Sequence, residues 1–319
     1  MRTRLKRAAD VRDLAVALHL DRVNLVAGGS STLDAREIAG RYPRLVRSVL
    51  LFNVTPPEAN RWNGAITNAA AALDRYFGEC AAQAKCAARY PQLRAQLEAA
   101  YARSQASPVT YTTPNPYDAS APPVAVLLDG DRVMQIALLG LDDPNALPLV
   151  AAAVADTQSG QSAVDFGVKA LVFPDDASWG ALLSRICVDE ISTVGREGLR
   201  VEAGAAAPLA FLSDDPLLDA CGVWKTPPTA IHAPSPAGTP ALVLEGALDP
   251  FTSPDWAAAT AHSLGRATIV QLPHLGRVAA SGDACITRIR LEFFDNPRAP
   301  VDARSCQHEI APILFAGAP

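Results

Sequence analysis

Three loops of the sequence carry side chains that could together cleave an acyl bond. Ser30, with Ser31 beside it, lies in a Gly-Gly-Ser-Ser-Thr turn between a short apolar segment and a predicted helix. Asp249 follows a second apolar segment, and His274 follows a third. A serine becomes a nucleophile when a histidine removes its proton and a carboxylate orients and stabilises the imidazolium. We therefore expect acyl transfer with Ser30 as nucleophile, His274 as base and Asp249 as the orienting carboxylate.

The negative charge that develops on oxygen during acyl transfer needs a hydrogen-bond donor. The backbone N–H of Ser31, at the start of the predicted helix, is the expected oxyanion donor. Structural roles are the alternative for each catalytic candidate. Ser30 and Asp249 could cap the helices that follow them, and His274 could be an exposed loop histidine.

These loops must be positioned by the elements before them. The pattern over residues 8–57 predicts an amphipathic helix over 8–21, a strand at Val23–Ala27, a helix at Leu33–Arg41 and a strand at Val46–Val54. A strand, helix and strand joined by short connections imply parallel pairing through a right-handed crossover. The carboxyl ends of parallel strands meet at one edge of a sheet, where ligands of open α/β sheets bind.

The same pattern returns near the end of the chain. It predicts a strand over 240–246, a helix at Pro254–Leu264, a strand at Ala267–Leu272 and a helix over 283–294. Between the two parts, alanine-rich helical periodicity dominates and no strand pattern is strong. The expected fold is therefore α/β, a short parallel sheet with a helical cap insertion. We expect residues 1–57 and 236–319 to form the α/β core, and residues 58–235 to form the cap.

Composition excludes several classes of function. The 319 residues are 49% hydrophobic and carry a formal net charge of -5, which indicates a globular protein and argues against a nucleic-acid partner. No apolar run approaches the roughly 20 residues of a membrane span. Gly28-Gly29 lacks the third glycine of a dinucleotide-binding motif. The sequence has no Cys-x-x-Cys pair, which argues against a zinc site. We expect no cofactor, no metal, and a small-molecule or short-peptide substrate.

The start of the chain and its cysteines give opposite indications about cellular location. The segment after the basic start carries four polar or charged residues, so it does not form the apolar region of an export signal. Six cysteines in near-sequential pairs are typical of a disulfide framework. Six reduced core thiols are the alternative, and the residues alone leave both open.

Several motifs resemble one branch of the α/β-hydrolases, that of the proline iminopeptidases and tripeptidyl aminopeptidases. The resemblance extends over nearly the whole chain. The family implies a secreted or periplasmic serine hydrolase with a helical cap and disulfides, which favours the pairs Cys80–Cys86, Cys187–Cys221 and Cys285–Cys306. The motifs that carry it are Asp21–Leu25, the turn, Ala39–Pro43, Gly246–Thr252, Cys86–Pro91 after Cys80, and Ala284 through Pro297 and Asp302 to Cys306.

This chain departs from the family at two motifs. The family has Gly-x-Ser-x-Gly at the nucleophile turn, and an ungapped alignment puts Gly29 at the serine position. A shift of one residue restores Ser30 but puts Thr32 at the second glycine. The family's Gly-His is matched by Gly276-Arg277, so His274 lies three residues early. Asp249 alone matches directly.

The family also has a β-rich segment ahead of the first helix, with a second oxyanion donor, and that segment is absent here. We therefore expect a sheet of about four strands with an exposed edge, which the cap or a second copy in a homo-oligomer would cover. The expected function is hydrolysis of ester, lactone or amide bonds, as in an esterase or an aminopeptidase. The alternative is a catalytically inactive α/β-hydrolase fold that serves as a binding module.

Overall fold

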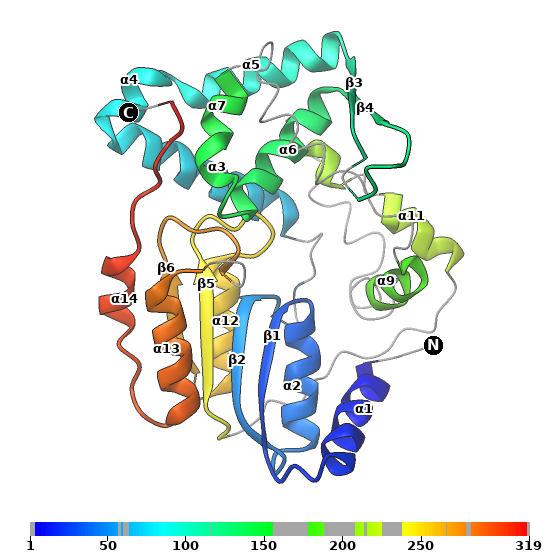
Figure 1. Ribbon diagram of the computed structural model, residues 1–319, viewed down its shortest axis with the longest axis vertical. Helices are drawn as coiled ribbons and strands as arrows, with labels where there is room; N and C mark the ends of the chain where they lie inside the picture. Colours follow the sequence, from blue (N-terminus) through cyan, green and yellow to red (C-terminus); the bar gives the residue numbers. More distant parts are fainter. Residues whose placement is uncertain are drawn as a thin grey trace.

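The computed structural model describes residues 4–56, 59, 64–115, 117–155, 178–187, 208–213, 216–224, 238–265, 267–278 and 282–317. The boundaries expected at 57/58 and 235/236 lie outside these residues. Figure 1 shows a lower part built around a parallel sheet, and above it a mostly helical part. We call these the core and the cap.

The core sheet has four strands in the order β1–β2–β5–β6, and each neighbouring pair is parallel. Its two central strands are almost entirely buried, because helices cover both faces, and they read as continuous apolar runs. The prediction of a parallel α/β sheet is thereby confirmed. The strands are β1 (Val23–Gly29), β2 (Val46–Val54), β5 (Ala241–Gly246) and β6 (Ala267–Leu272).

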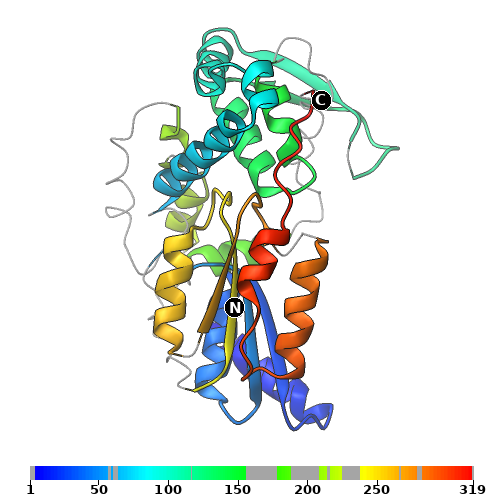
Figure 2. The same cartoon turned by 90° about the vertical axis from the view of Figure 1, so that its left-hand side faces the viewer.

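Helices cover the two faces of the sheet (Figure 2). Side chains alternate along a strand, so Val49 and Val243 face one layer of helices while Leu50 and Leu244 face the other. The first layer is α1 (Arg4–Ala17), α2 (Ser31–Arg41) and α12 (Pro254–Leu264), and the second is α13 (Ala284–Asp295) and α14 (Ala303–Glu309).

The first helix differs from its prediction. It spans Arg4–Ala17. Of the stripe that helical spacing predicts, Val11, Leu14, Ala15 and Leu18, Ala15 is buried and Val11 packs against the core, but Leu14 and Leu18 are each 58% exposed. Ala8 is buried as well. The basic start belongs to the helix because Arg7 donates to the Asp34 carboxylate of α2 at 2.7 and 3.0 Å.

The described part of the cap packs around its own apolar cluster. Tyr76, Leu97 and Leu138 come from three helices of this cluster, and Phe315 joins them from the C-terminal tail, which rises from the core to the cap (Figure 1). The tail is fixed there, since the Ala316 N–H donates to the Pro148 carbonyl at 2.9 Å. The cap helices are α3 (Ala65–Ala82), α4 (Ala84–Arg89), α5 (Leu93–Ala106), α6 (Gly130–Asp142), η1 (Leu147–Leu149), α7 (Val150–Ala155), α9 (Trp179–Arg185), η4 (Ala210–Ser213) and α11 (Pro216–Val223).

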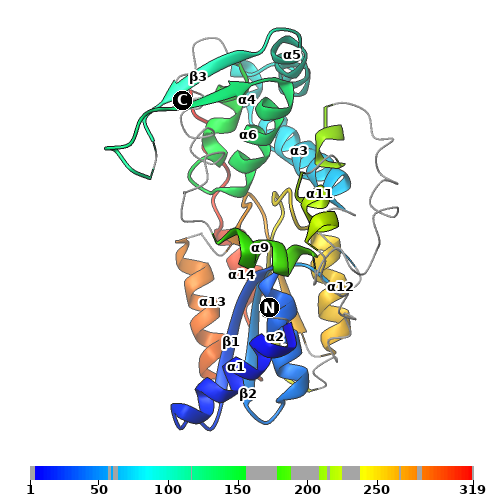
Figure 3. The same ribbon diagram turned by 90° about the vertical axis from the view of Figure 1, so that its right-hand side faces the viewer.

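The insertion, in which no strand pattern is strong, carries two strands beside its helices. β3 (Val109–Thr113) and β4 (Val124–Leu128) form an antiparallel hairpin, which projects from the cap in Figure 3. Each strand alternates between exposed and less exposed positions, which is a period of two. With five residues per strand the signal is short, and the adjoining proline-rich loop obscures it.

All six cysteines lie in pairs at disulfide distance. The Cα–Cα separations are 5.1 Å for Cys80–Cys86, 5.2 Å for Cys187–Cys221 and 5.3 Å for Cys285–Cys306. The first two pairs lie in the cap, and the third joins α13 to α14. These pairs are compatible with an extracellular location.

The edge of the sheet formed by β1 is open. β1 has a strand neighbour on one side only, and its Val26 is 54% exposed.

Within the described part of the chain, no helix has the length and apolar character needed to cross a membrane.

Candidate active site

The turn after β1 places a glycine, and not a serine, in the left-handed backbone region. Gly29 has φ +56°, whereas Ser30 has φ -64° and ψ -20° and begins the first turn of α2. A Cβ at Gly29 would meet no atom within 4 Å. The sharp turn is thus made at Gly29, the residue that the ungapped alignment with the family puts at the nucleophile position. Ser30 is the residue after this turn.

Three consecutive hydroxyl groups follow this turn, and they differ in their partners. The Ser31 hydroxyl donates to the Gly28 carbonyl at 2.7 Å, and the Thr32 hydroxyl donates to the Gly29 carbonyl at 2.6 Å. Ser30 is half-buried, and among the described residues its hydroxyl has no hydrogen-bond partner. The Ser31 N–H lies in the first turn of α2, where a helix leaves N–H groups without intrahelical acceptors.

Asp249 is buried after β5, and its carboxylate is fully occupied. Oδ1 accepts from the N–H groups of Phe251 at 2.6 Å and Thr252 at 3.0 Å. Oδ2 accepts from Asn53 Nδ2 at 2.6 Å and from Thr252 Oγ1 at 2.8 Å. Four donors fill the four acceptor positions of a carboxylate. Among the described residues, neither Ser30 nor His274 is a partner of Asp249.

A second carboxyl group, Glu245, is buried against Asp249. Burial and then the charge of Asp249 raise the pKa of Glu245 well above its usual range. Thr252 Oγ1 lies 2.6 Å from Glu245 Oε1 and 2.8 Å from Asp249 Oδ2, but a hydroxyl donates only one hydrogen. With a proton on Glu245, that acid donates to Thr252, and Thr252 donates to Asp249.

Asn53 connects this acidic group to the loop that carries His274. It is the penultimate residue of β2 and has φ +47°, in the left-handed region that asparagine tolerates. Its Oδ1 accepts from the Val278 N–H at 3.0 Å, while its Nδ2 donates to Asp249. Asn53, Thr252 and Glu245 were not predicted, although Asn53 lies at the carboxyl end of a predicted parallel strand, at the edge where ligands bind.

His274 pairs with the cap. Its Nδ1 lies 2.8 Å from Oε1 of Glu79 on α3, although the ring N–H is not aligned for a hydrogen bond. Both side chains are partly buried, at 20% and 26% exposure. The backbone of His274 has φ +61°, a conformation that residues other than glycine adopt at a cost and that often accompanies functional strain.

Arg277, which stands at the family's histidine position, also pairs with the cap. Its guanidinium forms an ion pair with Asp142 at the end of α6, and its N–H donates to the Asp142 carbonyl at 2.8 Å. Burial and then the charge of Asp249 raise the pKa of Asp142 to about 7, against the opposing charge of Arg277.

The structure therefore brings the three predicted loops to one edge without joining the three side chains. Ser30 follows β1, Asp249 follows β5 and His274 follows β6. Three strand spacings of about 4.8 Å separate the ends of β1 and β6 by roughly 14 Å. The loop after His274 turns back across the sheet, since Leu275 O accepts from Leu248 N at 2.8 Å.

The raised pKa of Asp142 predicts how stability changes with pH. Between pH 4 and pH 7 the folded state holds a proton that the unfolded state releases, so the free energy of unfolding falls as pH rises. Asp142→Asn removes this contribution. The free energy of unfolding is measured by urea denaturation at pH 4.5 and at pH 7.5. From the lower to the higher pH, the value for the variant should rise relative to that of the wild type by on the order of 2–4 kcal/mol.

Asp143→Asn is the matched control, because Asp143 is the next residue and accepts from the Asn145 N–H at 2.7 Å. The charge of Asp143 is the smallest of the causes that raise the pKa of Asp142, so this variant should follow the wild type far more closely than Asp142→Asn does. An Asp142→Asn variant that tracks the wild type equally well would contradict the assignment of this pH dependence to Asp142.

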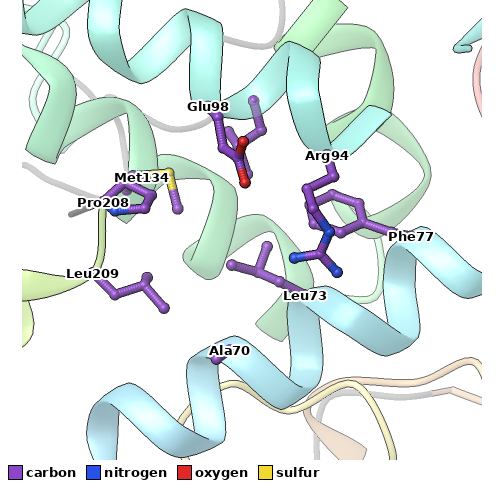
Figure 4. A pocket seen from close by; sticks show the side chains of 9 residues that line it. Ala70, Leu73, Phe77, Arg94, Glu98, Met134, Pro208 and Leu209 are labelled. Carbon is purple, nitrogen blue, oxygen red and sulfur yellow. The ribbon is translucent and has the colours of Figure 1, made fainter. Parts of the chain in front are cut away.

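A small cavity of about 80 Å³ lies inside the cap (Figure 4). Leu73, Leu97 and Met134 form its apolar wall, and Arg94 and Glu98 supply charged groups. None of the predicted catalytic residues lines it. In the described ranges, no group of three or more His, Cys, Asp or Glu side chains is placed to hold a metal ion.

A family model described as "TAP-like protein", of the α/β-hydrolase kind, matches residues 211–306. No protein of curated function matches the chain.

Solved structures similar to the chain include three enzymes of low sequence identity. MGS-M2, an α/β-hydrolase from a Medee basin deep-sea metagenome library, is 12% identical over 94% of this chain and 74% of its own, with a TM-score of 0.36. The hydrolase olei00960 from Oleispira antarctica is 14% identical over 93% and 75%, with a TM-score of 0.37. A haloalkane dehalogenase DbeA-M1 loop variant from Bradyrhizobium elkanii is 15% identical over 96% and 76%, with a TM-score of 0.35.

The family match over residues 211–306 and the parallel sheet between two layers of helices together support a fold of the α/β-hydrolase kind. Within it, the matched C-terminal segment is that of the TAP-like proteins, which points to the aminopeptidase branch. This match supports hydrolase activity of the α/β-hydrolase kind.

Proposed function

We propose that the protein hydrolyses ester, lactone or amide bonds through Ser30, with His274 as the base and Asp249 as the stabilising carboxylate. The observation that carries this proposal is the state of the three hydroxyl groups after β1. Those of Ser31 and Thr32 are held by backbone carbonyls, whereas that of Ser30 has no partner among the described residues. Ser30 thus has the hydroxyl with a free proton at the edge where α/β sheets bind ligands.

In this proposal the first turn of α2 supports the developing oxyanion. The N–H of Ser31 lies beside the nucleophile and at the positive end of the helix dipole. The substrate is a small acyl compound or a short peptide that enters between the core and the cap. The three cysteine pairs support an oxidising location outside the cytoplasm.

One observation favours the second candidate, a catalytically inactive α/β-hydrolase fold that binds a ligand. The left-handed turn residue is Gly29, so the position that the ungapped alignment gives to the nucleophile has no side chain. The two candidates differ in whether any serine of the folded protein is activated.

Covalent labelling with a fluorophosphonate probe tests the proposal, because such probes react with activated serines. We expect a single adduct on Ser30, mapped by peptide mass spectrometry, and turnover of a short-chain p-nitrophenyl ester. Heat-denatured protein is the control and should remain unlabelled. Absence of both label and turnover would support the inactive fold, and a label on another serine would reject Ser30.

A further inference from the structure

The loop from His274 to Val278 is held from two sides. From the core, Leu248 N donates to Leu275 O at 2.8 Å, and Asn53 accepts from Val278 N at 3.0 Å. From the cap, Asp142 binds both the guanidinium and the N–H of Arg277. The fit against the cap is tight, since a Cβ at Gly276 would lie 1.9 Å from the Leu141 carbonyl oxygen.

The cap also determines where the imidazole points. The carboxylate that faces His274 is Glu79 of α3, at 2.8 Å, and not Asp249, whose oxygens are occupied by other donors. Arg75 on the same helix donates to the Ala247 carbonyl at 3.2 Å, so α3 rests on the loops after both β5 and β6. In this arrangement the base is bound to the cap and separated from Ser30.

We propose that Glu79 and Asp142 form a latch through which the cap inhibits hydrolysis. The latch holds the His274–Val278 loop against the cap and keeps the imidazole away from Ser30. Release of these two contacts lets the loop move toward the end of β1, where His274 can take the Ser30 proton. This inference rests on the proposed function, since it assigns a closed state to the same site.

Labelling kinetics test the inhibitory role. Glu79→Gln and Asp142→Asn each replace the carboxylate of one contact with an amide of the same shape, so each should raise the rate of fluorophosphonate labelling at Ser30 by about fivefold. The double variant should exceed both single variants. A lower rate in Glu79→Gln would overturn the latch, because Glu79 would then position the base for catalysis.

Glu309→Gln is the matched control. Glu309 forms an ion pair with Arg288 at 2.7 Å between α14 and α13 of the core, and both side chains are exposed. The control should label at the wild-type rate. An equal acceleration in this variant would also overturn the proposal, since loss of any ion pair would then suffice.

Hydrogen–deuterium exchange tests the latch without activity. Amides in the peptide that spans 274–278 should exchange about tenfold faster in the Glu79→Gln/Asp142→Asn variant, while β5 and β6 remain as protected as in the wild type. Unchanged exchange in the loop would overturn the latch whatever the labelling shows. If the loop exchanges faster but neither the wild type nor any variant is labelled, the inhibitory role and the proposed function are both overturned. Only the restraint of the 274–278 loop by the cap would then remain.

Discussion

Replacing Ser30 with alanine should lower ester turnover by at least about 10³-fold, because the two hydroxyls that follow it, those of Ser31 and Thr32, already donate to backbone carbonyls. Ser31→Ala should cost far less. It removes a hydroxyl that only bridges the backbone of Gly28, and it leaves the Ser31 N–H in place. The measurement is kcat/KM with a short-chain p-nitrophenyl ester, with circular dichroism to show that both variants are folded.

Gly29→Ser tests the competing position. A serine fits there, since no atom lies within 4 Å of its Cβ, although φ +56° makes the residue strained. If Ser30 is the nucleophile, this variant gains nothing. If Ser30→Ala keeps wild-type turnover and Gly29→Ser raises it, the reactive position is residue 29, and the natural chain lacks its nucleophile.

Gly246→Ala should destabilise the protein by about 3 kcal/mol or more. The added Cβ would lie 1.8 Å from the carbonyl oxygen of Gly276 and 2.6 Å from that of Leu275. Both are backbone atoms in a loop fixed by hydrogen bonds, so neither can move alone. Urea denaturation should show a lower midpoint, and labelling of Ser30 should change as the loop is displaced.

Gly78→Ala is the control for this prediction. Gly78 lies within α3, and no atom is within 4 Å of the position that a Cβ would take. Alanine is the better helix former, so the variant should be as stable as the wild type, or more stable by up to about 1 kcal/mol. Wild-type stability in Gly246→Ala would mean that the loop does not approach β5 as closely as described.

Much of the core could be predicted because its signals are local. The strand Val46–Val54 and the helix Pro254–Leu264 have the predicted bounds. Their signals, an apolar run and a Ser-Pro pair at a helix start, each consist of neighbouring residues. The β3–β4 hairpin could not be recognised, because its strands are short and half exposed. Leu14 was assigned to the wrong face, because alanines fill the narrow contact between α1 and the core.

The sequence by itself determined the types and order of the strands, the edge at which Ser30, Asp249 and His274 lie, and cysteines spaced for three pairs. Only the tertiary structure decided their partners. Asp249 binds Asn53, which is 196 residues away, and His274 pairs with Glu79 of a separate helical insertion. The physical reason is range. Periodicity and spacing act over a few residues, whereas hydrogen bonds and ion pairs between buried side chains depend on how distant segments pack.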